Sequence, residues 1–224
     1  ETNDGKPQLE QALQVYRAGK PEIIDKPVAS NLAEVVAIYR AAEHFDVPMF
    51  SSSSLRYSEG AQAIRAGKVG DVLGCNAYSP ASIEPSHTDL VWYGFHGVES
   101  LCTCMGGGCE RVSHVATEGR ELAVGVWSGG RIGTFHGIRE GKAGYGGTAF
   151  GTTGITPIGD YGGYRPLVVE IAKFFRTREA LIDPQETIEP YACMEAAAES
   201  KRNRGASGAI ADVMSVAEVK ATEL

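Results

Sequence analysis

Residues 19–27 read GKPEIIDKP, a stretch in which a glycine ends a helix and a short apolar strand runs into an acid, a lysine and a proline. Open α/β sheets bind their ligands at the carboxyl ends of their strands, so Lys26 is predicted to lie at a ligand site. Pro27 fixes its own φ and pushes Lys26 toward extended geometry. An ammonium group held in this way can donate to a substrate hydroxyl or carbonyl and take part in proton transfer.

Helical and strand patterns alternate on both sides of this stretch. Apolar residues at helical spacing predict helices over 8–18, about 31–44 and about 57–66. A second short apolar strand is predicted over 47–50. The order helix, strand, helix, strand, helix is typical of a parallel sheet.

The pattern then changes to that of an antiparallel sheet. A strand is predicted over 71–79 and a helix over 95–105. Short strands separated by glycine-containing turns follow, over 110–117, 120–127, 131–138 and 145–152. Helices over about 163–177 and about 184–203 come last.

These patterns predict a fold of two parts, α/β followed by α+β. Residues 1–54 form a piece of a parallel α/β unit, and residues 55–205 form an α+β domain with a mostly antiparallel sheet flanked by helices. Residues 206–224 are rich in small side chains and are expected to be a loose C-terminal tail.

Composition excludes several classes of partner. The chain has 224 residues and a formal net charge of -7, which argues against nucleic-acid and anionic-membrane partners because both need a basic surface. No apolar stretch approaches the roughly 20 residues that span a bilayer. Nothing at the N-terminus resembles a signal peptide, and we expect a cytoplasmic protein, although the chain starts at Glu1 and an earlier segment is expected to be missing.

The five cysteines do not indicate disulfides, because their number is odd and their spacing scattered. Cys102, Cys104 and Cys109 lie close together, which leaves a thiolate metal site open as one interpretation. Such sites usually have four ligands and spacings such as C-x2-C. We therefore interpret these cysteines as small buried residues at a helix end and expect no metal.

Several segments in order resemble the Gfo/Idh/MocA oxidoreductases over roughly residues 5–205. The usual Glu-Lys-Pro of that family is here Asp25-Lys26-Pro27, and further matches lie at 31–34, 47–50, 64–70 and 92–99. The resemblance implies a Rossmann-type sheet, NAD or NADP as cofactor, and hydride transfer with a small sugar-like or polyol substrate. It also implies that Lys26 and His96 act at the reacting carbon.

Two departures from the family pattern affect the expected chemistry. The family often has an aspartate four residues before the histidine, where this chain has Trp92, so the nearest titratable group and third catalytic candidate is Tyr93. No strand here is followed by G-x-G-x-x-G and a helix. The first half of the Rossmann unit is therefore expected to be missing, which leaves weak or no cofactor binding in this chain.

The resemblance also implies binding residues on both sides of the reacting carbon. The cofactor-binding candidates are Asp25, Lys26, Pro27 and Asn3. The substrate-binding candidates are Arg56, Tyr57, Tyr161 and Tyr164. For the last two tyrosines, the alternative interpretation is a capping loop before a helix.

Two functional hypotheses follow. The first is an NAD(P)-dependent oxidoreductase of a sugar-like or polyol substrate that lacks most of its nucleotide-binding half. The alternative is a non-catalytic ligand-binding or oligomerisation module derived from that family. Under both hypotheses, we expect a homo-oligomer that forms through the antiparallel sheet.

Overall fold

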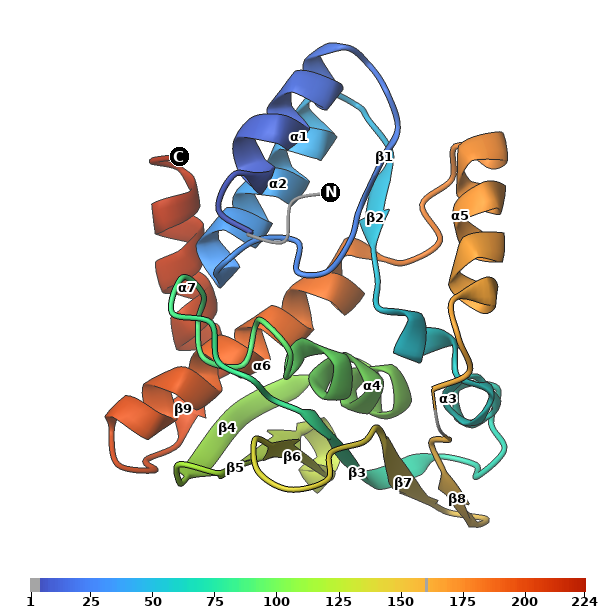
Figure 1. Ribbon diagram of the computed structural model, residues 1–224, viewed down its shortest axis with the longest axis vertical. Coiled ribbons are helices and arrows are strands. Elements are labelled where there is room, and N and C mark those ends of the chain that lie inside the picture. The colour runs from blue at the N-terminus through green and yellow to red at the C-terminus, as the bar shows by residue number, and fades with distance from the viewer. Residues whose placement is uncertain (1–4, 160) are drawn as a thin grey trace.

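The structure, a computed structural model, describes residues 5–159 and 161–224. Figure 1 shows the small sheet of the N-terminal segment standing above the broad sheet of the second part. The predicted fold class is confirmed, because a short parallel sheet is followed by a mostly antiparallel sheet flanked by helices.

The N-terminal segment alternates helix and strand as its sequence pattern predicts. Its elements are α1 (Gln8–Arg17), β1 (Glu22–Ile24), α2 (Leu32–His44) and β2 (Met49–Ser51). β1 pairs in parallel with β2, with Ile23 opposite Phe50, and no other described strand pairs with β1. Within residues 5–159 and 161–224, one edge of β1 therefore has no strand paired with it. α2 begins where the Asn31 side chain accepts a hydrogen bond from Glu34 N–H at 3.0 Å.

The broad sheet contains seven strands in the order β8-β7-β3-β6-β5-β4-β9. The strands are β3 (Val72–Pro80), β4 (Cys109–Ala116), β5 (Arg120–Trp127), β6 (Ile132–Ile138), β7 (Gly146–Gly151), β8 (Ile155–Pro157) and β9 (Gly208–Ala209). β3 and β6 pair in parallel, and the other neighbouring pairs are antiparallel. The sequence predicts the five longer strands, whereas β8 and β9 are too short for a periodic pattern.

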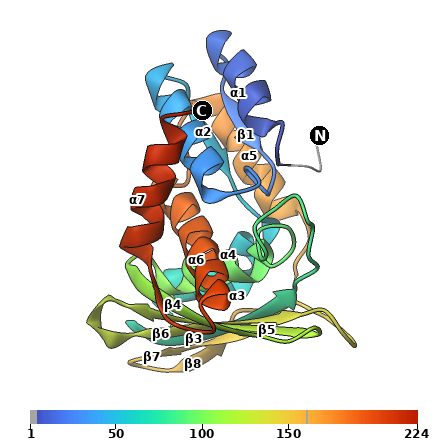
Figure 2. The same cartoon turned by 90° about the vertical axis from the view of Figure 1, so that its left-hand side faces the viewer.

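Helices cover one face of the broad sheet. In Figure 2 the sheet runs along the bottom, with α4 (Phe95–Met105) and α6 (Pro184–Arg202) above it. α4 lies close to the strands because Gly97 has no side chain: a Cβ there would lie 2.4 Å from Phe135 Cε2 and 2.8 Å from Ser79 Oγ. On the opposite face, exposed apolar side chains include Leu122, Ile132, Phe150 and Ile155.

The prediction of a loose C-terminal tail is wrong, because residues Ile210–Ala221 form helix α7. α7 packs along α2, and the two are joined where Arg40 Nη1 donates to the Glu218 carbonyl at 3.0 Å. Val213 and Ala217, four residues apart, are buried on one side of α7. Small side chains at helical spacing therefore allow close packing here, whereas their composition alone predicts a loose chain.

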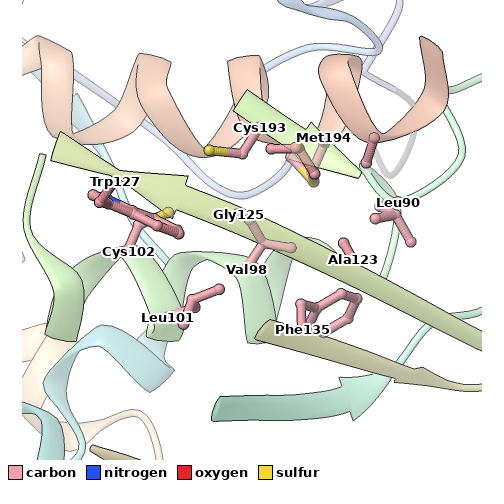
Figure 3. Close-up of a pocket in the computed structure, with 12 residues that line it drawn as sticks. Leu90, Val98, Leu101, Cys102, Ala123, Gly125, Trp127, Phe135, Cys193 and Met194 are labelled. Atoms are coloured by element: carbon pink, nitrogen blue, oxygen red, sulfur yellow. The ribbon is translucent and has the colours of Figure 1, made fainter. Parts of the chain in front are cut away.

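The main hydrophobic core lies between the broad sheet and the helices α4 and α6. It encloses a cavity of about 20 Å³, shown in Figure 3, beside the buried ring of Trp127. The lining is apolar apart from the thiols of Cys102 and Cys193. A ligand site needs polar groups that fix orientation, so we place no site in this cavity.

Candidate active site

Lys26 lies directly after β1, at the carboxyl end of the strand, as the sequence predicts. Its Nζ is 5.0 Å from the centroid of the Tyr93 ring and 5.8 Å from that of Trp92. Burial lowers the pKa of Lys26, and the charge of Asp25 opposes this shift only in part. The ammonium thus lies over aromatic faces, where it loses water but keeps a favourable cation–π contact.

His96 is the second residue of α4, and its imidazole meets the loop that follows β2. His96 Nδ1 lies 2.7 Å from Ser53 Oγ. Burial, and then the positive charge of Lys26, lower the pKa of His96 to about 3. His96 is therefore neutral at physiological pH and shares the environment of the Lys26 ammonium.

Tyrosine rings extend from His96 toward the surface. The ring centroids of Tyr93 and Tyr145 are 5.5 Å and 5.7 Å from that of His96. Tyr161 follows at 6.3 Å from Tyr145, and Tyr164 at 5.7 Å from Tyr161. The structure thus brings Tyr161 and Tyr164 together with the catalytic candidates through a ring that sequence reasoning missed, Tyr145. Its one available signal was an aromatic side chain in a glycine-rich turn.

A groove beside Lys26 runs between α1, β1 and α5 (Arg165–Thr177) and has a volume of about 540 Å³. Its polar lining includes Gln8, Gln11, Asp25, Lys26 and Ser52. Tyr164 lies at the same groove, whereas Pro27 is buried behind it. Of the four cofactor-binding candidates, Asn3 lies outside the described residues.

The groove suits the nicotinamide and its ribose better than it suits the pyrophosphate of a dinucleotide. Amide, hydroxyl and ammonium groups beside Lys26 can hydrogen-bond a nicotinamide amide and a ribose. No glycine-rich turn leads from a strand into a helix N-terminus among the described residues, so the usual cradle for the pyrophosphate is not present there.

Arg56, a substrate-binding candidate from the sequence, does not join this site. Its side chain is buried, with Nε 3.3 Å from Glu99 Oε1 and Nη1 2.7 Å from Glu186 Oε2. Its Nη2 donates to the Glu186 carbonyl at 3.2 Å, so the guanidinium is occupied within the protein. Tyr57 packs against a small apolar cluster around Phe50; Leu167 and Ile171 of that cluster line the groove beside Lys26, but Tyr57 itself does not.

Glu186 also departs from the sequence interpretation. Asp183 and Glu186 are three residues apart at the start of the predicted helix 184–203, a spacing that favours a capping box with reciprocal bonds to the backbone. Asp183 does accept from Gln185 N–H at 2.8 Å. The Glu186 carboxylate instead binds Arg56 and, at 2.7 Å, Arg65. A long-range ion pair thus replaces a local cap.

The part of the chain that the structure describes offers neither a metal site nor a helix that could span a membrane. No group of His, Cys, Asp and Glu side chains there is arranged to hold a metal ion, and the five cysteines are buried free thiols. None of the helices within residues 5–159 and 161–224 combines the length and the apolar character that crossing a bilayer demands.

Solved dehydrogenase structures match this fold at low sequence identity. A probable dehydrogenase from Thermotoga maritima matches with a TM-score of 0.76 and 16% identity, over 93% of this chain and 79% of that chain. This chain therefore has the fold of these dehydrogenase structures. A putative myo-inositol dehydrogenase from Sinorhizobium meliloti matches with a TM-score of 0.78 and 12% identity, over 92% and 78% of the two chains. A putative NADPH-dependent oxidoreductase from Desulfitobacterium hafniense matches with a TM-score of 0.78 and 15% identity, over 93% and 78%.

No protein-family model and no curated protein matches this sequence. The similarity to the solved structures is therefore one of fold, and the activity has to be argued from the residues of the site.

Proposed function

We propose that this chain carries the substrate-binding and catalytic part of an NAD(P)-dependent oxidoreductase of the Gfo/Idh/MocA family, acting on a small sugar-like or polyol substrate. One observation carries the proposal. Lys26 and His96, far apart in sequence, both lie against the Tyr93 ring, 5.0 Å and 5.5 Å from its centroid. Solved structures of the same fold, one named a myo-inositol dehydrogenase and another an NADPH-dependent oxidoreductase, support this class.

In this proposal, each polar side chain near the groove has a distinct role. NAD or NADP, when bound, supplies the hydride chemistry. Lys26 binds the substrate oxygen and moves its proton, since its lowered pKa makes a neutral amine more accessible. His96 orients the same oxygen, and Tyr93 packs between the two basic groups. The exposed groove residue Asp25 positions the nicotinamide side of the cofactor.

Turnover with a polyol and NAD or NADP tests the proposal, with cofactor reduction followed by absorbance. We expect Lys26→Met to lower turnover by at least about 100-fold, the usual contribution of a positioned acid–base group. Lys20→Met is the matched control, because Lys20 is exposed and lies just before β1. Measurable and equal turnover of the two variants would remove Lys26 from the chemistry.

Cofactor binding separates this proposal from the non-catalytic alternative. Trp92 lies 5.8 Å from Lys26 Nζ, so NADH bound beside Lys26 should quench its fluorescence. The Trp92→Phe variant retains only Trp127, which is buried in the core, and should lose most of the quenching. No quenching at millimolar NADH, together with a stable dimer, would favour the oligomerisation module.

Self-association of the chain through the broad sheet is part of the proposal. The face away from the helices exposes Ile132 by 51% and Ile155 by 69%, together with Leu122 and Phe150. An apolar sheet face of this kind is typical of a protein interface. A second copy would cover it through an isologous contact between two such faces.

A further inference from the structure

The hydrogen bonds of Ser53 restrict the tautomer of His96. Ser53 Oγ accepts a hydrogen bond from Leu55 N–H at 3.2 Å and lies 2.7 Å from His96 Nδ1. Within the described residues, His96 Nδ1 is the one partner to which the Ser53 hydroxyl can donate. A buried hydroxyl that leaves its hydrogen unpaired is costly. The favourable arrangement is therefore Ser53 Oγ–H donating to Nδ1.

Neighbouring groups hold Ser53 in place for this contact. Its backbone N–H donates to Glu99 Oε2 at 2.8 Å, and Ser52 Oγ donates to Glu99 Oε1 at 3.2 Å. Glu99 is fully buried and lies three residues after His96 on α4, so one helix positions both the imidazole and the serine loop. Arg56 balances the Glu99 charge from the far side.

We propose that Ser53 donates to His96 Nδ1 and holds the neutral imidazole as the Nε2–H tautomer, so that His96 donates a hydrogen bond to a substrate oxygen and Ser53 is its positioning residue. The substrate oxygen in this statement rests on the proposed function, whereas the tautomer does not. A donor so placed stabilises negative charge that develops on oxygen. The proton of a substrate hydroxyl then has Lys26 as its acceptor.

The groups around His96 favour the neutral form. Lys26 faces it from the end of β1 and adds positive charge, which together with burial lowers the pKa of His96. Tyr93 from the turn just before α4 and Tyr145 from the residue just before β7 contribute rings. A base role for His96 would require the charged form that these neighbours disfavour.

Long-range ¹H–¹⁵N NMR of the histidine rings in the full chain tests the tautomer without substrate or cofactor. The chain has five histidines, and the His96→Gln variant identifies the resonances of His96 by their loss. We expect a pyridine-like Nδ1 and a pyrrole-like Nε2 that stay constant from about pH 5 to about pH 8. A pyrrole-like Nδ1, or shifts that titrate near pH 6.5, would overturn the proposal.

Variants of the serine loop extend this test. In Ser53→Ala the Nδ1 resonance should move away from its pyridine-like position toward the average of the two tautomers. Ser54→Ala is the control, because Ser54 is also buried but the hydrogen bond to His96 Nδ1 is made by Ser53, and its spectrum should match the parent. An unchanged Nδ1 in Ser53→Ala would refute the role of Ser53. If Ser53→Ala does not fold, the parent spectrum alone decides the tautomer.

Discussion

At the scale of single residues, burial, more than any charged neighbour, shifts the pKa values of the two basic residues in the site. Lys26 and His96 are both basic, and burial is the largest cause of the lowered pKa of each. Two positive charges in one small volume would repel, so holding His96 neutral is what allows Lys26 to remain beside it. The free energy of unfolding should therefore depend on pH through His96.

We predict that His96 makes the chain less stable in mild acid. Its pKa is about 3 when folded and about 6.5 when unfolded, so between these values only the unfolded chain binds the proton. The free energy of unfolding should then fall by up to about 1.4 kcal/mol per pH unit below pH 6.5 from this residue. Urea unfolding at neutral and mildly acidic pH measures the effect. His96→Gln should weaken the pH dependence, and the exposed control His136→Gln should not; equal slopes for both variants would contradict the prediction.

At the scale of elements, α4 is central because it carries His96 and Glu99 and lies against the broad sheet. The contact at Gly97 leaves no room for a methyl group, since Phe135 Cε2 would lie 2.4 Å from it. We expect Gly97→Ala to lower the free energy of unfolding by about 1–3 kcal/mol. Gly154→Ala, where no atom lies within 4 Å of the added Cβ, should stay within about 0.5 kcal/mol in the same thermal or urea measurement. Equal losses of stability in the two variants would mean that α4 can move away from Phe135 at no cost in free energy.

The two arginines that share Glu186 should differ strongly in their contribution to stability. Arg56 also neutralises the fully buried Glu99, so Arg56→Met would leave that carboxylate unpaired and cost about 3–5 kcal/mol. Arg65 is 38% exposed, so Arg65→Met should cost less than about 1 kcal/mol. Chemical denaturation of both variants decides this, and similar losses would argue against Arg56 as the structural ion.

Elements with strong local patterns were predictable from the sequence, and those defined by distant contacts were not. α4 is predicted at its observed bounds because its apolar residues have helical spacing and Gly106 ends it. Lys26 is predicted at a strand end because Pro27 follows it. Tyr145 could not be placed beside His96, because the register of β7 decides that contact. The pairing of Arg56 with Glu99 and Glu186 could not be predicted either, because those partners lie on α4 and α6, which are far from Arg56 in the sequence.

At the scale of the whole molecule, the bare face of the broad sheet should control the oligomeric state. We predict that Leu122→Lys combined with Ile132→Lys shifts the chain toward the monomer in sedimentation experiments, because charges at an apolar interface disfavour burial. Val216→Lys combined with Val219→Lys is the control, since these residues are similarly exposed on α7. A monomeric parent at tens of micromolar would refute self-association.

The free edge of β1 has a practical consequence for anyone who purifies this chain. An unpaired strand offers its backbone groups to any extended polypeptide that arrives, so loss of material should accelerate as the solution is concentrated. Unfolding, by contrast, proceeds at a rate that dilution does not change. Storage at low concentration should therefore preserve the preparation, and capping that strand with a designed peptide should make the loss independent of concentration.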